Sequence, residues 1–181
     1  HCIMAGIIEV SKGSMPTIHN TREGDMSSEE LGQCLLDVKS WLQTHASAVK
    51  LGDAASDSEI ESLKSKLSDT SLPPAVQGLL RACNGGLPLF DFITLSAADI
   101  AAVREQSISS PKWRADLLPV ASNPDGGGLL VLADGRIRSW DGDEGLGAAE
   151  GTLEGYLESY RNRMLAGKLE YVEGCGIMEL A

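Results

Sequence analysis

Aromatic side chains are scarce in this chain of 181 residues, which holds two Phe, three Tyr and three Trp. Aromatic residues make up only 4% of the sequence, whereas hydrophobic residues make up 43%. Because that hydrophobic share is ordinary for a globular protein, the core has to be packed mainly by aliphatic side chains. Each of Trp41, Trp113 and Trp140 is therefore a position worth locating in the fold.

Cysteine and histidine are too few and too scattered for a zinc or dithiol site. None of the four cysteines, Cys2, Cys34, Cys83 and Cys175, belongs to a Cys-x-x-Cys pair or has a histidine at zinc-ligand spacing. Cys34 and Cys83 fall on apolar faces of predicted helices, so we expect them to be small core residues. Beyond residue 26 the sole histidine is His45, which we expect to be a surface cap at a helix end.

Long apolar runs are also missing. No stretch approaches the length of a membrane span, which excludes a transmembrane helix as a prediction. With unpaired cysteines as well, the sequence favours a reducing, cytoplasmic compartment and no membrane partner.

Positive charge is in deficit, with 15 Lys and Arg against 26 Asp and Glu and a formal net charge of −11. Such a surface repels the phosphates of nucleic acids and anionic membranes, so we expect no nucleic-acid partner. The charge fits a basic protein partner, although acidic surfaces are also common on solvated cytosolic proteins.

Recognised catalytic motifs are absent, including Gly-x-Ser-x-Gly, His-Glu-x-x-His and the phosphate loop. The run Gly126-Gly127-Gly128 lacks the lysine and helix that phosphate binding needs, and is typical of a hairpin connection. Glu150, Glu154 and Glu158 recur every four residues, which predicts the solvated side of the last helix. We therefore predict a protein that is not an enzyme and uses no cofactor.

What the sequence does contain is a series of well-marked helices. Ser27 with Glu30 forms a capping-box pattern, and Pro74 suits the first turn of a helix. Gly85 and Gly167 are suited to end helices, because glycine adopts positive φ at low cost. The predicted helices begin near residues 27, 57, 74, 96 and 152.

Strands are predicted in the second half. Phe90–Leu95 and Leu117–Ala121 read as strands, and a short strand is expected at 171–172. Asp134-Gly135 between two apolar runs predicts a two-residue hairpin of 129–133 and 136–140. That hairpin would place Val131 opposite Arg138 and Leu129 opposite Trp140. The acidic, Gly-rich stretch 141–150 is expected to be a mobile loop.

Together these elements predict an α+β fold, with a twisted, mainly antiparallel sheet packed by about five helices. Residues 27–181 show no internal boundary and are expected to form a single domain. Residues 1–26 mix Gly, Ser, Pro and Thr around one short apolar run. We expect them to be an arm or an appended segment that contains at most one edge strand.

The order of motifs in residues 28–165 resembles the SUKH superfamily, which includes fungal cell-wall-assembly regulators and bacterial immunity proteins. The resemblance rests on the following segments: Asp57-Ser58-Glu59-Ile60, Leu72-Pro73-Pro74, Asn84-Gly85-Gly86, Phe90–Leu95, Trp113, Leu118-Pro119-Val120-Ala121, Asn123–Gly128, Leu129–Trp140 and Thr152–Leu165. It implies a sheet packed by helices and a binding function without a shared catalytic site. Residues 70–72 depart slightly from the family pattern, and residues 1–27 have no counterpart in it.

Three functions follow as hypotheses. The leading one is a non-catalytic, intracellular protein-binding domain that acts as a regulator or scaffold subunit. Its predicted contact surface combines the mixed face of the hairpin with the acidic stretch that follows, namely Arg136, Arg138, Trp140, Asp141, Asp143 and Glu144. The second is an immunity protein that inhibits a basic toxin enzyme, and the third is a metal-binding protein or enzyme that uses the carboxylates of 141–144.

Overall fold

The computed structural model describes residues 26–67 and 70–181. Within these residues the chain forms five helices, α2 (Ser28–His45), α3 (Asp57–Lys66), α4 (Pro74–Ala82), α5 (Ala97–Ser107) and α6 (Leu153–Leu165). The arm predicted for residues 1–26 lies, apart from Met26, outside the described residues. The predicted α+β class is confirmed.

Local signals set the ends of the helices as expected. Ser27 caps α2 and Ser56 caps α3. In each cap the serine hydroxyl oxygen accepts a hydrogen bond at 3.1 Å from the backbone N–H of a glutamate, Glu30 or Glu59. The side chain of that glutamate accepts from the serine backbone N–H in return, which completes a capping box. Pro74 occupies the first turn of α4. Gly85 follows α4 with φ +88°, and a Cβ there would lie 2.7 Å from the Ser96 backbone nitrogen, so only glycine fits.

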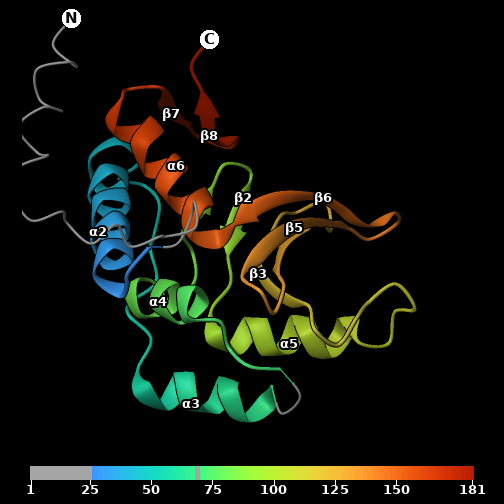
Figure 1. Ribbon diagram of the computed structural model, residues 1–181. Coiled ribbons are helices and arrows are strands. Elements are labelled where there is room, and N and C mark those ends of the chain that lie inside the picture. The colour runs from blue at the N-terminus through green and yellow to red at the C-terminus, as the bar shows by residue number, and fades with distance from the viewer. Residues whose placement is uncertain (1–25, 68–69) are drawn as a thin grey trace, which may run out of the picture.

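The sheet is a six-stranded antiparallel meander in the order β1-β2-β3-β4-β5-β6. Its strands are β1 (Pro88–Leu89), β2 (Phe92–Thr94), β3 (Leu118–Ser122), β4 (Gly128–Val131), β5 (Arg136–Asp141) and β6 (Gly145–Thr152). A separate hairpin pairs β7 (Leu169–Val172) with β8 (Gly176–Glu179), where the sequence had predicted only one short strand. Figure 1 shows the sheet curving around α5, with α2 and α6 side by side at the other end of the molecule.

The single strand predicted for Phe90–Leu95 is wrong. The chain reverses at Phe90 and Asp91, so that Leu89 pairs with Phe92 across a tight β1–β2 turn. Phe90 has φ +58°, an uncommon value for a residue with a bulky side chain. Asp91 is the one turn-forming residue at the centre of the turn, and the apolar residues on both sides of it concealed the reversal.

The register predicted for the Asp134-Gly135 hairpin is wrong by one residue. Val131 pairs with Ile137, and the loop has three residues, because the Leu132 N–H donates to the Arg136 carbonyl at 2.8 Å. Gly135 has φ +85°, as expected for the last residue of a three-residue hairpin loop. The shift places Val131 and Ile137 on the same face, in the main core.

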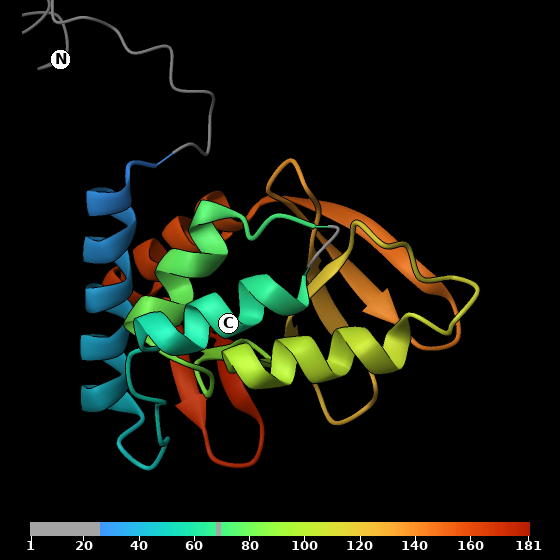
Figure 2. The same ribbon diagram turned by 90° about the horizontal axis from the view of Figure 1, so that it is seen from below.

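Both faces of this hairpin are occupied by apolar side chains. The face shared with the helices belongs to the main core, which the side chains of all five described helices enter. The opposite face carries a second, smaller core of Trp113, Leu117 and Leu130, with Leu132, Trp140 and Leu146 packed against it. Figure 2 shows α3 and α5 side by side in front of the sheet when the molecule is viewed from below.

Residues 141–150 do not form the mobile loop that their composition predicted. They complete β5, turn tightly at 142–144 and run into β6, which is an edge strand of the sheet. The register between β5 and β6 shifts twice, so β6 is a bulged strand. Bulges are common on edge strands, where they re-aim side chains.

Candidate functional site

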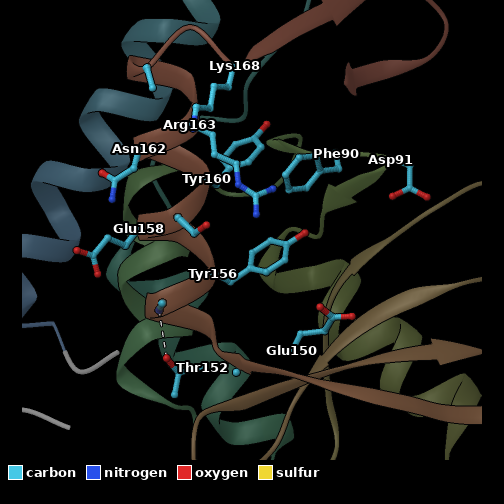
Figure 3. Close-up of a pocket in the computed structure, with 14 residues that line it drawn as sticks. Phe90, Asp91, Glu150, Thr152, Tyr156, Glu158, Tyr160, Asn162, Arg163 and Lys168 are labelled. Atoms are coloured by element: carbon cyan, nitrogen blue, oxygen red, sulfur yellow. Dashed lines mark hydrogen bonds between the residues drawn. The ribbon is translucent and has the colours of Figure 1, made fainter. Parts of the chain in front are cut away.

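A groove of about 990 Å³ runs along α6 and is closed on one side by the β1–β2 turn and the end of β6 (Figure 3). Three aromatic side chains form its floor. The Phe90 ring meets the Tyr160 ring edge to face at 5.1 Å and the Tyr156 ring at 6.2 Å, measured between ring centroids. In a chain with 4% aromatic residues, three rings in one place form an unusual concentration.

The positions of these rings follow from the backbone. Tyr156 and Tyr160 lie four residues apart on α6, so their side chains project from the same face of the helix. The buried Tyr160 hydroxyl donates to the Pro88 carbonyl at 2.8 Å, which ties α6 to the β1–β2 turn. Phe90 is held over both tyrosines by the positive φ of that turn.

One end of the groove is acidic. Asp91 from the β1–β2 turn and Glu150 from β6 line it, and the side chain of neither makes an ion pair or hydrogen bond with any residue of the described chain. Burial raises the pKa of Tyr156 to about 12, and the negative charges of Glu150 and Asp91 add to the increase. The Tyr156 hydroxyl therefore lies in a negative potential that these two carboxylates create.

The other end of the groove is basic, and one of its two cations is paired within the chain. The Arg163 guanidinium lies over the Phe90 ring at 5.7 Å from its centroid and forms an ion pair with Glu179 of β8. Lys168 is exposed beside it. Among the described residues Lys168 at this end has no ionic partner, and neither have Asp91 and Glu150 at the acidic end.

The predicted row of Glu150, Glu154 and Glu158 on one helical face is wrong, because Glu150 belongs to β6. A register shift between β5 and β6 falls around Glu150 and Gly151, where Arg138 pairs with Ala149 and Arg136 with Thr152. The bulge directs the Glu150 carboxylate into the groove (Figure 3). Periodicity alone had no means of finding this side chain.

The residues predicted as a contact surface lie together on β5 and the turn after it. Three of them, Arg138, Trp140 and Asp141, have structural roles. The Arg138 guanidinium donates to the Gly147 carbonyl from Nε at 2.9 Å and from Nη2 at 2.7 Å, which bridges β5 to β6. Trp140 is partly buried against Trp113 in the second core. Arg136 is exposed, 3.7 Å from a carboxylate oxygen of its neighbour Asp134.

Of the three carboxylates in the turn after β5, only that of Asp141 has a structural role. One Asp141 carboxylate oxygen accepts from the backbone N–H groups of Glu144, at 3.0 Å, and Asp143, at 2.8 Å. These hydrogen bonds lower the pKa of Asp141, and the charge of Lys112 adds a smaller contribution. Asp143 and Glu144 are exposed, and the Lys112 ammonium donates to the Asp143 carbonyl.

Across 26–67 and 70–181, no group of three or more His, Cys, Asp and Glu side chains is arranged to hold a metal ion. The ring of His45, the one histidine in these ranges, stacks on Trp41 at 4.3 Å, and its Nδ1 lies 3.0 Å from the Trp41 carbonyl oxygen. The groove offers aromatic rings, carboxylates and one serine, Ser159, which suits binding of a cation or a peptide.

Sequence reasoning missed the groove. Tyr156 and Tyr160 belong to no recognised motif, and Phe90 was expected in a strand. No local pattern links residue 90 to residues 150 and 156, which come from three separate elements. The nearest sequence signal was the shortage of aromatic residues, which gives weight to any place where three of them meet.

Comparison with models of known protein families finds none that matches this chain. A search of curated proteins likewise finds no match. Among the helices that the structure describes, none is both long and apolar enough to cross a membrane.

Proposed function

We propose that this chain is a non-catalytic protein-binding domain of the SUKH type, which acts in the cytoplasm as a regulatory or scaffolding subunit. Its principal contact surface is the groove over α6, and its partner presents a basic segment. The observation that carries this proposal is the pair of unpaired carboxylates, Asp91 and Glu150, in one groove with the half-buried rings of Phe90 and Tyr156.

Aromatic and charged side chains in one hollow are what a protein interface needs. Tyrosine is enriched among residues that dominate binding energy, since it combines a large apolar surface with a polar hydroxyl. Carboxylates without a partner attract a basic protein before contact and reject an acidic one. The net charge of −11 extends the same attraction over the whole surface.

The predicted hairpin surface is a second candidate contact, limited to those of its residues that have no structural role. Arg136, Asp143 and Glu144 are exposed and available to a partner. Arg138, Trp140 and Asp141 support the local structure, so substitutions there change the fold as well as any contact.

Affinity capture with the immobilised chain, followed by calorimetry with the purified partner, tests the proposal. The groove variant is Asp91→Asn with Glu150→Gln, and the matched control is Glu170→Gln with Glu173→Gln, which removes two exposed carboxylates away from the groove. Both variants change the net charge equally, from −11 to −9. We expect the groove variant to lose about tenfold in affinity and the control to keep it.

A third variant, Asp143→Lys with Glu144→Lys, tests whether the partner binds to the hairpin surface instead of the groove. Loss of binding in this variant alone would move the contact to the hairpin and contradict the groove proposal. Equal binding by all three variants would show that neither surface meets the partner.

A further inference from the structure

The groove already holds one arginine of its own chain. The Arg163 guanidinium lies 5.7 Å from the centroid of the Phe90 ring and forms an ion pair with the Glu179 carboxylate. A guanidinium is bound here by the face of an aromatic ring and a carboxylate, two groups that complement its charge and its flat shape.

The acidic end of the groove offers the same two kinds of group, an aromatic ring and carboxylates. Tyr156 supplies the ring, 6.2 Å from Phe90 and at 80° to it, and Asp91 and Glu150 supply two carboxylates. Figure 3 shows the Tyr156 hydroxyl pointing to the side of the groove where these carboxylates lie. Within the described residues no cation pairs with either carboxylate, in contrast to Glu179.

We infer that the acidic end of the groove binds an arginine side chain of the partner protein, with its guanidinium against the Tyr156 ring and between the Asp91 and Glu150 carboxylates. This inference rests on the proposed function and names the group that the same surface recognises. The Tyr156 hydroxyl is an additional acceptor, since it makes no hydrogen bond within the described chain.

Arginine fits this site better than lysine for a geometric reason. Its guanidinium is planar, offers five N–H donors and is weakly hydrated, so it stacks on a ring and donates to two carboxylates at once. A lysine ammonium is compact and strongly hydrated, and loses more on leaving water. The opposite end of the groove carries Lys168, which has no ionic partner among the described residues, so it disfavours a second cation there and confines the guanidinium to the acidic end.

Three short peptides, each in N-acetylated and C-amidated form, test the inference: Gly-Arg-Gly, Gly-Lys-Gly and Gly-citrulline-Gly. Citrulline keeps the length and planarity of arginine but carries no charge. Binding to the full chain is followed by the backbone amide signals of the β1–β2 turn, the end of β6 and the start of α6 in nuclear magnetic resonance spectra. We expect saturable shifts with the arginine peptide, with a Kd of roughly 1 mM, and several-fold weaker binding of the lysine peptide.

Variants of the protein complete the test. Asp91→Asn with Glu150→Gln should abolish the shifts, whereas Tyr156→Phe, which keeps the ring, should keep most of them and Tyr156→Leu should reduce them. The carboxylate control variant Glu170→Gln with Glu173→Gln should bind as the unaltered chain does. Equal binding of the citrulline or lysine peptide, or unchanged amide signals with the arginine peptide, would overturn the inference.

Failure of the inference and failure of the proposed function give different results. If the purified partner loses affinity for the groove variant but the arginine peptide leaves the amides unmoved, the groove binds a protein through another group. If the partner binds the groove variant normally, the proposed function is itself wrong.

Discussion

The indole rings of Trp113 and Trp140 meet edge to face, with centroids 5.2 Å apart and ring planes at 73°. Trp113 comes from the segment after α5, and Trp140 comes from β5. Their contact anchors that segment to the outer face of the hairpin and forms the centre of the second core. Trp140 is therefore part of the folded framework as well as of the predicted contact surface.

Substitutions at these tryptophans should reveal the contact. We expect Trp113→Ala to lower the free energy of unfolding by about 3 kcal/mol, because Trp113 is buried, and Trp140→Ala to cost less. The double variant should cost about 1 kcal/mol less than the sum of the two single ones, which is the energy of the ring pair. Urea unfolding of the four chains measures this, and strict additivity would show that the rings contribute only by their separate burial.

Removing the hydroxyl of Tyr160 should destabilise the fold. Tyr160→Phe keeps the ring but leaves the buried Pro88 carbonyl without its donor at 2.8 Å, a loss of about 1–2 kcal/mol. Tyr171→Phe is the matched control, because the Tyr171 side chain is only partly buried and its hydroxyl has no hydrogen bond in the described chain. Equal melting temperatures for the two variants would contradict the structural role of the Tyr160 hydroxyl.

The charge of Glu150 should be visible in the titration of Tyr156. Burial raises the pKa of Tyr156 to about 12, and the Glu150 carboxylate is the largest charge contribution in the same direction. Glu150→Gln removes that charge, so the pKa of Tyr156 should fall below about 12 while remaining above the ordinary tyrosine value. Spectra of ring-labelled tyrosine as a function of pH measure the change, and an unchanged pKa would place Glu150 farther from the ring.

Alkaline pH should destabilise the protein through the same side chains. Burial raises the pKa of both Tyr156 and Tyr160 in the folded state, so above the ordinary tyrosine value of about 10 the unfolded chain releases protons that the folded chain retains. The stabilisation is fully present below pH about 10 and falls as the pH rises towards 12. Urea midpoints between pH 8 and 11.5 should decline less steeply for Tyr156→Phe; an identical pH dependence would indicate that Tyr156 ionises normally.

Thiol reactivity should separate the cysteines. Burial raises the pKa of Cys34 and of Cys83, and both thiols donate to backbone carbonyls inside the fold. Cys175 is exposed in the β7–β8 turn. In a Cys2→Ser background, a thiol reagent at pH 8 should modify Cys175 rapidly and the other two only after unfolding. Adding Cys175→Ser should remove the fast phase, and a fast phase that persists would mean that the fold opens around α2 or α4.

The sequence by itself determined the helices and their buried faces. Ser27, Pro74, Gly85 and Thr152 act through their own turn of backbone, so their effect can be read without knowing what lies nearby. The buried residues of α2 recur along the sequence at helical spacing, because burial on a helix repeats with the helical period; they are Leu31, Cys34, Leu35, Val38, Trp41 and Leu42. The α+β class follows from these elements.

Only the tertiary structure decided the sheet details and the groove. A hairpin loop of two residues and one of three residues at Gly135 differ little in local structure. They differ in which residues of β4 share a face with Ile137 of β5. Packing of Val131 and Ile137 into the main core fixes the three-residue loop. The turn at Phe90 and the strand β6 have weak local signals and are held by neighbouring elements. Phe90, Glu150 and Tyr156 come together because the meander and α6 bring three separate segments to one place, a consequence of contacts between residues about sixty positions apart that no local pattern encodes.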